Sequence, residues 1–349
     1  MDNLVNLSNT FWDKFPQVLE MAVKSRWVSI AIQSTGHAPS GAPTFEERYE
    51  DFRNAATQTQ IVEISFTFGV YDKDTGMYTL EIFEFATSPF LPSSEARLSK
   101  HLARTLSMSP TACDFLRRCE FPLESAIYDG VSYLNRQEEL LLLKLHLEDP
   151  HAYDMLSHTD QETRQCRVST IASRIHKCVG VRYLIDALTG HPFASKIDPA
   201  WCGGNISKTR LNEIEKSLKD RRPILVGHNV FDTLFLMHAL FIGELPRTAS
   251  KFSSAIHNLF PRIVDIDYVQ KTWEPVGDSL SHLEAHYQNK MLPVTEKGIH
   301  PNTSVRQPAE FIIVSETSIF VEGALVPFQY DIETTARQWR RNVPWPSKG

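Results

Sequence analysis

Residues 222–243, RPILVGHNVFDTLFLMHALFIG, predict a short strand, a glycine-containing turn and a buried helix. The apolar run 224–226 forms the strand, and the turn follows at 227–229. Asp232 then opens an apolar run typical of a buried helix, which we expect to end at Gly243. In α/β proteins, polar residues at the carboxyl end of a strand often form a site. The pattern fits equally an ordinary capped helix in which Asp232 stabilises the first turn, so the motif alone leaves both interpretations open.

The residues before this unit predict a helix, a strand, a second helix and a β-hairpin. The second helix begins with a capping box, because Glu47 follows Thr44 by three residues. The hairpin turn, KDTG, carries its glycine where a left-handed backbone is needed. The expected ranges are 11–24 for the first helix, 27–32 for the strand, 44 onward for the second helix, and 61–71 and 77–85 for the hairpin strands.

Further helices and one more strand are predicted along the rest of the chain. Residues 95–120 have a helical pattern that faces mostly outward, and a strongly apolar helix runs from Asn135 to about residue 147. Residues 260–269 predict a strand, and 278–290 predict a short helix.

We expect one domain over residues 1–325, with an insertion at about 151–205 and a C-terminal tail at 326–349. The composition changes in the insertion, which we interpret as a partly helical cap. It is locally basic, and the simplest interpretation of that charge is a solvated helix face rather than a binding site. The basic residues are Arg164, Arg167, Arg174 and Lys177.

Composition excludes several classes of protein. Hydrophobic residues make up 42% and charged residues 22%, as in ordinary soluble proteins. The five cysteines form no CxxC pair, which argues against a zinc ribbon or a disulfide scaffold. The N-terminus lacks the pattern of a signal peptide, and no apolar stretch is long enough for a membrane span. The net charge of −6 means that nucleic acid would need a local basic groove.

The order of several motifs resembles the PARN-like deadenylase ribonucleases, which belong to the DEDD exonuclease group. The resemblance covers roughly residues 10–140 and 205–290, through WVSIAIQSTG, TFEERYEDFR, QIVEISFTFGVYD, GHNVFDTLF and FPRIVDIDYV. It implies an α/β fold with an RNase H-like mixed β-sheet flanked by helices. It also implies removal of nucleotides from RNA 3′ ends, often poly(A), with two divalent ions such as Mg²⁺ held by four acidic residues.

Two ions at such a site need a dense set of anionic oxygen ligands. One ion orients the attacking hydroxide and the other stabilises the leaving oxygen. Hard cations prefer oxygen ligands, and carboxylates offset the mutual repulsion of the two ions. Replacement of these carboxylates therefore removes the reason for the ions to bind together.

The first family motif, Asp-x-Glu at the end of the first strand, is degenerate in this chain. The resemblance places Ala31 at the Asp position and Gln33 at the Glu position. An alanine side chain cannot bind a metal ion. A glutamine offers only a neutral carbonyl oxygen, which is a weak ligand that leaves the charge of the ions unbalanced.

The second motif is retained. Gly227, His228 and Asn229 followed by Asp232 match the family pattern GHN-x-x-x-D, with one residue fewer before the aspartate than in some members. The resemblance makes Asp232 the expected catalytic and metal-binding acid, and His228 and Asn229 the expected substrate-binding residues. For Asp265, in the next strand, we predict a role in stabilising the local turn.

The third motif, His-x-x-x-x-Asp, has two possible placements. The first starts near His282 and puts Leu283 at the histidine position and Gln288 at the aspartate position. The second keeps His300 as the catalytic histidine but puts Val305 at the aspartate position. Neither placement supplies a carboxylate, so three of the four metal-binding acids are missing in both.

Several other residues are candidate replacements for the missing ligands, but the sequence does not place them near Asp232. The carboxylates considered are Glu63, Asp278 and Glu284. His282 and His286 are four residues apart on one predicted helix, yet no third ligand accompanies them. No nucleophile elbow, P-loop or dinucleotide-binding motif offers a different chemistry.

The sequence therefore predicts a catalytically impaired member of an RNA 3′-exonuclease lineage that still binds RNA. The first alternative is an active exoribonuclease that uses Mg²⁺ and relocated acids. The second is a scaffold that binds only protein, which the net charge of −6 favours. We expect RNA or protein partners, no membrane association and no DNA specificity. The expected compartment is the nucleus or the cytoplasm. The expected cofactor is Mg²⁺ if the protein is active and otherwise none.

Overall fold

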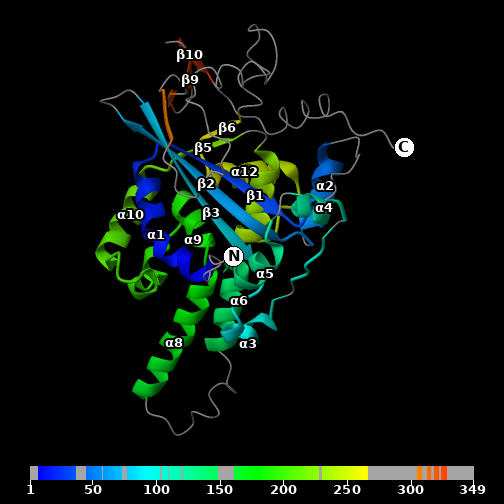
Figure 1. Ribbon diagram of the computed structural model, residues 1–349, viewed down its shortest axis with the longest axis vertical. Coiled ribbons are helices and arrows are strands. Elements are labelled where there is room, and N and C mark those ends of the chain that lie inside the picture. Colours follow the sequence, from blue (N-terminus) through cyan, green and yellow to red (C-terminus); the bar gives the residue numbers. More distant parts are fainter. Residues whose placement is uncertain are drawn as a thin grey trace.

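The structure is a computed structural model. It describes residues 7–36, 45–56, 58–72, 77–102, 104–108, 110–118, 121–147, 161–227 and 230–265, together with four short strands between 305 and 327. Figure 1 shows a central sheet with helices packed around it.

The central sheet is mixed. Its strands lie in the order β4-β3-β2-β1-β5-β6, and β7 pairs with β3. Strands β1, β2 and β3 are antiparallel neighbours, whereas β1–β5, β5–β6 and β3–β4 are parallel pairs. Their bounds are β1 Trp27–Ser34, β2 Ile61–Asp72, β3 Met77–Ser88, β4 Val131–Ser132, β5 Ile224–Gly227, β6 Ile263–Asp265 and β7 Val305–Pro308. A small separate sheet contains β8 Ile313–Ser315, β9 Ser318–Val321 and β10 Ala324–Pro327.

The helices connect these strands and cover the sheet. They are α1 Leu7–Lys24, α2 Phe45–Ala56, α3 Ala96–Ser99, α4 Pro110–Arg118, α5 Leu123–Asp129, α6 Arg136–Leu147, α8 Gln161–Val179, α9 Arg182–Leu188, α10 Lys208–Asp220, α11 Phe231–Met237 and α12 Ala249–Leu259. Single turns occur at η1 Ser93–Glu95, η2 Ala194–Lys196 and η3 Pro199–Cys202, and α11 continues into a π-helix, η4 His238–Ile242. The predicted α/β fold with a mixed sheet flanked by helices is confirmed.

Alternation along β1 decides which face of the sheet is buried. Val28 and Ile30 point into the main core, opposite Phe68 and Phe66 of β2. Successive side chains of a strand point to opposite faces, so the residues between them face away from this core. The helices contribute many large side chains to the same core, including Phe11 of α1. One continuous apolar cluster thus joins the sheet to its covering helices.

An aromatic cluster attaches α2, α11 and α12 to one another. Phe52 of α2 contacts the rings of Phe231 and Phe235 of α11, and Phe252 of α12 lies 5.8 Å from Phe235 between ring centroids. Tyr49 completes the cluster and donates a hydrogen bond from its hydroxyl to the Pro246 carbonyl at 2.8 Å. These contacts hold the start of α11 in place at the edge of β5.

The segment expected to form an insertion contributes buried residues to the main core. Every residue of α9 is buried, and Tyr183 and Ile185 are completely inaccessible. In α8, Arg174 is exposed and pairs with Glu95, while Lys177 is exposed. The side chains at 164 and 167 lie outside the described residues. The boundaries of the insertion and of the tail stay predictions, but α9 packs as part of the domain.

A buried charge network ties α6 to α8 and α9. Glu139 accepts a hydrogen bond from Arg182, and it lies 3.0 Å from His176 Nδ1 and 2.8 Å from Lys196 Nζ. Arg182 is fully buried and also lies 3.4 Å from Asp186. Burial alone would raise the pKa of Glu139, but these three partners hold that pKa well below its usual range.

Most predicted elements are confirmed. The first helix begins earlier than expected, at Leu7, and the strand predicted at 260–269 is described only as β6. The helix predicted at 278–290 and the hairpin turn at 73–76 lie outside the described residues. Within the described part of the chain, no helix combines the length and the apolar character that a bilayer crossing requires.

We predict that Gly130→Ala destabilises the protein. A Cβ atom at Gly130 would lie 2.2 Å from the Ala126 carbonyl oxygen of α5 and 2.9 Å from the Ser88 nitrogen of β3, so both the end of α5 and its contact with β3 must shift. Overpacking of this kind costs about 1–3 kcal/mol of unfolding free energy, which urea denaturation would measure. The control is Asp129→Ala at the neighbouring exposed position, with a change within about 0.5 kcal/mol. Wild-type stability in Gly130→Ala would contradict this tight contact.

We also predict that His238 makes the stability of the folded protein sensitive to acid. Burial lowers the pKa of His238 from 6.5 to about 4, and its Nδ1 has no hydrogen-bond partner among the described residues. Between these pH values the unfolded chain binds a proton that the folded protein excludes, so stability falls as the pH drops from about 6.5 towards 4.

The measurement compares unfolding free energies at pH 7 and pH 5. His238→Leu keeps an apolar side chain in this buried position and removes the titrating group. The loss of stability on acidification should therefore be smaller in the variant by about 2 kcal/mol. An equal loss in both proteins would show that His238 is protonated in the folded state without cost.

Candidate functional site

The carboxyl ends of β1 and β5 form the edge at which the candidate site lies. The two strands are parallel, with Trp27 opposite Ile224 and Val28 opposite Leu225. Because β5 ends at Gly227, the last residues of β1 extend beyond it. The start of α11 follows β5 directly, so the first and second motifs meet at this edge of the sheet.

The first motif faces away from the main core. Ala31 and Gln33 are both exposed, on the opposite face of β1 from Val28 and Ile30. In the register with β2, Ala31 pairs with Ser65 and Gln33 pairs with Glu63. The two side chains therefore occupy the face that is open to a ligand, but they bring no carboxylate to it.

Glu63 is the carboxylate that the structure adds to this region. Directly paired residues of antiparallel strands have Cβ atoms about 5 Å apart on the same face, so the Glu63 side chain neighbours that of Gln33. Partial burial raises the pKa of Glu63, and the charge of Glu84 raises it further. Sequence reasoning named Glu63 as an alternative ligand but could not place it. The strand register supplies that placement.

Asp232 lies in the first turn of α11 and is partly buried. A carboxylate in the first helical turn is stabilised by the positive end of the helix dipole. The neighbouring turn is fixed by Asp265, a completely buried residue whose Oδ2 accepts a hydrogen bond from the Val230 backbone nitrogen at 3.1 Å. The predicted role of Asp265 in stabilising the local turn is confirmed.

A hydrogen-bond network that the sequence did not reveal supports the end of β1. Thr35 and Gln60 exchange backbone and hydroxyl hydrogen bonds, and the Tyr133 hydroxyl donates to Gln60 Oε1 at 2.7 Å. The Arg104 guanidinium stacks 4.6 Å from the Tyr133 ring centroid and binds Glu138. In the sequence, the only signal of this network is the group of polar residues before the strand that begins at Ile61. The network makes this edge rigid without adding a metal ligand.

The donor set at this edge does not fit the two-ion centre that the resemblance implies. Ala31 has no donor atom, Gln33 offers a neutral oxygen, and Asp232 is the retained carboxylate. Among the described residues, no group of three or more histidine, cysteine, aspartate or glutamate side chains is arranged to hold a metal ion. We therefore assign no catalytic step through a metal to these residues.

Among the other predicted site residues, the structure describes only Val305. His228, Asn229, Gln288 and His300 lie outside the described residues. Val305 begins β7, where it pairs with Leu80 of β3. Leu80 is opposite Gly69, and Gly69 is opposite Trp27, so Val305 lies level with the amino end of β1. Both placements of the third motif stay predictions, because residues 282–288 and 300 lie outside the described residues.

Comparison with solved structures gives a distant similarity. Schizosaccharomyces pombe Pop2p, solved in a Mg²⁺- and Mn²⁺-bound form, is 12% identical. The alignment covers 80% of this chain and 80% of that chain, with a TM-score of 0.43.

Comparison with known sequences gives two relatives and one family. The pre-piRNA 3′-exonuclease trimmer of Bombyx mori is 21% identical over 268 residues, which cover 65% of this chain and 49% of the relative. The poly(A)-specific ribonuclease PARN of Arabidopsis thaliana is 42% identical over 48 residues, which cover 14% of this chain and 7% of the relative. The chain thus spans half or less of the length of these relatives. Residues 6–316 match the family described as CAF1 family ribonuclease, and the chain therefore belongs to that family.

Proposed function

We propose that this protein is a catalytically impaired member of the CAF1 ribonuclease family that binds RNA. The observation that carries the proposal is the exposed face of β1, where Ala31 and Gln33 stand at the positions that the resemblance assigns to two carboxylates. The proposed compartment is the nucleus or the cytoplasm, and the proposed ligand is single-stranded RNA.

Electrostatics explains why the loss of two carboxylates matters more than the loss of two contacts. Coulomb repulsion scales with the product of the charges, so two divalent ions repel four times as strongly as two monovalent ions at the same separation. The carboxylates of a two-ion centre offset this repulsion, which a neutral amide cannot do. Asp232 alone is therefore expected to bind at most one ion weakly.

RNA binding does not require these ions. Single-stranded RNA is held by stacking of bases on aromatic side chains and by contacts between phosphates and Arg or Lys. The net charge of −6 opposes long-range attraction of RNA, so the binding must depend on a local surface. We therefore expect modest, salt-sensitive affinity that does not change when divalent ions are removed.

One observation favours a second candidate, an active exoribonuclease with relocated acids. Glu63 lies beside Gln33 on the exposed face, one strand away from the missing carboxylate. Burial and the charge of Glu84 raise the pKa of Glu63, and a bound cation would have the opposite effect. A third candidate, a protein-binding scaffold, would show neither RNA shortening nor RNA binding.

We predict that the protein does not shorten RNA. Purified protein incubated with 5′-labelled oligo(A) and Mg²⁺ or Mn²⁺ should leave the oligonucleotide intact, because the ions lack their ligands. Denaturing gel electrophoresis over several hours measures this. The double substitution Ala31→Asp with Gln33→Glu should not restore activity by itself, because the third-motif acid is also missing.

Two variants distinguish the proposal from the second candidate. Metal-dependent shortening that Asp232→Ala abolishes would refute catalytic impairment. If Glu63→Gln abolishes it too, while the exposed neighbour Glu84→Gln does not, the relocated acid is identified. Shortening that persists in all variants would indicate a contaminating nuclease, and the preparation must then be purified further before the comparison is made.

A further inference from the structure

Two aromatic side chains are exposed where β3 ends. Phe90, two residues after the strand, has 48% of its surface exposed, and Tyr128 of α5 has 76% exposed. A single exposed aromatic residue is common on soluble proteins and needs no explanation. Two large, exposed aromatic side chains on adjacent segments are less common and indicate a candidate binding surface.

Close packing holds these two segments together. The Ser88 hydroxyl donates a hydrogen bond to the Ile127 carbonyl at 2.5 Å and accepts one from the Phe90 backbone nitrogen at 3.1 Å. Tyr128 follows Ile127 directly, and Gly130 lets the end of α5 approach the backbone of β3 more closely than any larger residue allows. The backbones that carry both rings are therefore fixed relative to each other.

The aromatic pair lies at the same edge of the sheet as the candidate site. Gln33 of β1 is opposite Glu63 of β2, and Glu63 is opposite Ala86 of β3. The carboxyl ends of β1 and β3 thus reach the same edge, and Phe90 lies just beyond it. A strand of RNA that enters the degenerate site can continue across β2 and β3 to these rings.

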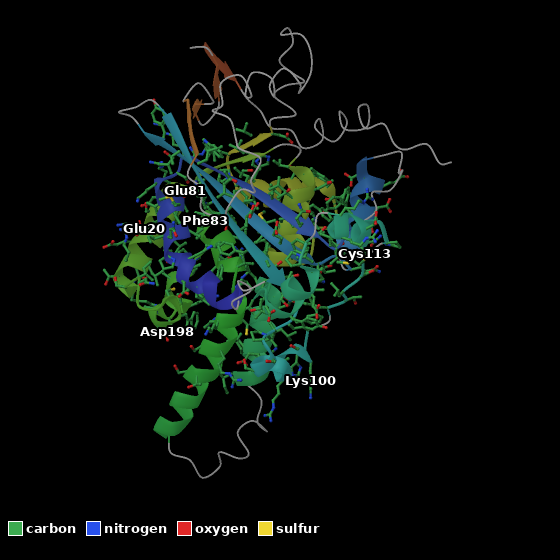
Figure 2. All side chains as sticks on the ribbon, viewed as in Figure 1. Glu20, Glu81, Phe83, Lys100, Cys113 and Asp198 are labelled. Atoms are coloured by element: carbon green, nitrogen blue, oxygen red, sulfur yellow. The ribbon has the colours of Figure 1, made fainter. Side chains whose placement is uncertain are left out.

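Cationic side chains follow Phe90 along the chain. Arg97 of α3 and Lys100 are exposed, and neither takes part in an ion pair within the described ranges. Figure 2 shows Lys100 beside α3, at the end of the molecule away from β9 and β10. Arg97 is seven residues after Phe90, so their backbones lie within about 25 Å. A short oligonucleotide can therefore contact both the rings and the cations.

We propose that Phe90 and Tyr128 form a stacking surface for the bases of single-stranded RNA, with phosphates directed towards Arg97 and Lys100. The inference rests on the proposed RNA binding and adds the surface that performs it. Every base has a π-face, so such a surface accepts RNA without reading its sequence. The exposed lysine on the segment that follows Phe90 favours RNA over a protein partner, because lysine is depleted from protein–protein interfaces.

The test measures binding and stacking separately. An oligo(A) of twelve nucleotides with 2-aminopurine at internal positions is titrated with the full chain in EDTA, and both anisotropy of an end label and 2-aminopurine fluorescence are recorded. The wild-type protein should bind and quench the fluorescence. Phe90→Ala and Tyr128→Ala should each weaken binding by about tenfold and reduce the quenching.

Matched variants control for polarity, hydrophobicity and charge. Tyr128→Phe keeps a ring and should bind like the wild type, whereas Leu140→Ala removes an exposed apolar side chain on α6 and should also have no effect. Lys100→Gln should leave the quenching unchanged and lower the salt dependence of log K by about 0.7, the value for one phosphate contact on a single strand. Unchanged thermal unfolding confirms that each variant is folded.

The outcomes separate this inference from the proposed function. A wild-type protein that does not bind the oligonucleotide would refute the RNA-binding role itself and the stacking surface with it. Binding by the wild type that Phe90→Ala and Tyr128→Ala leave unchanged would refute only the stacking surface. Weaker binding with full quenching in both variants would also refute it, because the bases would then stack elsewhere.

Discussion

The register of β1 is the constraint on which the rest of the structure depends. Side chains alternate along a strand, so burial of Val28 and Ile30 forces Ala31 and Gln33 to the other face. A shift by one residue would bury the glutamine and expose the isoleucine. Pairing with β2 on one side and β5 on the other excludes this shift. The site positions therefore follow from the packing of their neighbours.

This arrangement separates the stability of the fold from the chemistry of the site. The side chains at 31 and 33 contribute little to the core, so their replacement leaves the packing of Val28 and Ile30 intact. Carboxylates grouped without a cation also repel one another. Alanine at 31 and glutamine at 33 remove part of that repulsion, which favours the folded state of the domain. The packing of the fold therefore does not depend on carboxylates at these two positions, because the chemistry of a site depends on the side chains that a fold carries.

Local patterns were sufficient for much of the fold. Alternating apolar residues predicted β1 and β2, and the apolar run after Asp232 predicted α11. The π-helical turn at 238–242 was not predicted, because periodicity does not distinguish one type of helical turn from another over five residues. The burial of α9 was not predicted, because the whole segment 151–205 was interpreted as a partly helical cap. Composition does not show that the arginine and aspartate of α9 pair with each other inside the core.

The candidate site was predictable only in part, because its missing components depend on contacts between distant residues. The sequence identified Ala31, Gln33 and Asp232, and the structure places the first two on one face and the start of α11 at the same edge. It could not show that Glu63 faces Gln33, since that requires the register of two strands. Nor could it show that Tyr133 supports Gln60 from 73 positions away.

The strongest buried charge network of the described residues belongs to the helices. Catalytic sites often concentrate strongly perturbed acids, although structural ion-pair networks perturb them as well. Here the acid most strongly stabilised in its charged form is Glu139, whose partners belong to α8, α9 and η2. At the edge of β1, burial instead raises the pKa of Glu63, and the charge of Glu84 raises it further. The strongest buried ion pairs of the described residues thus join helices to one another.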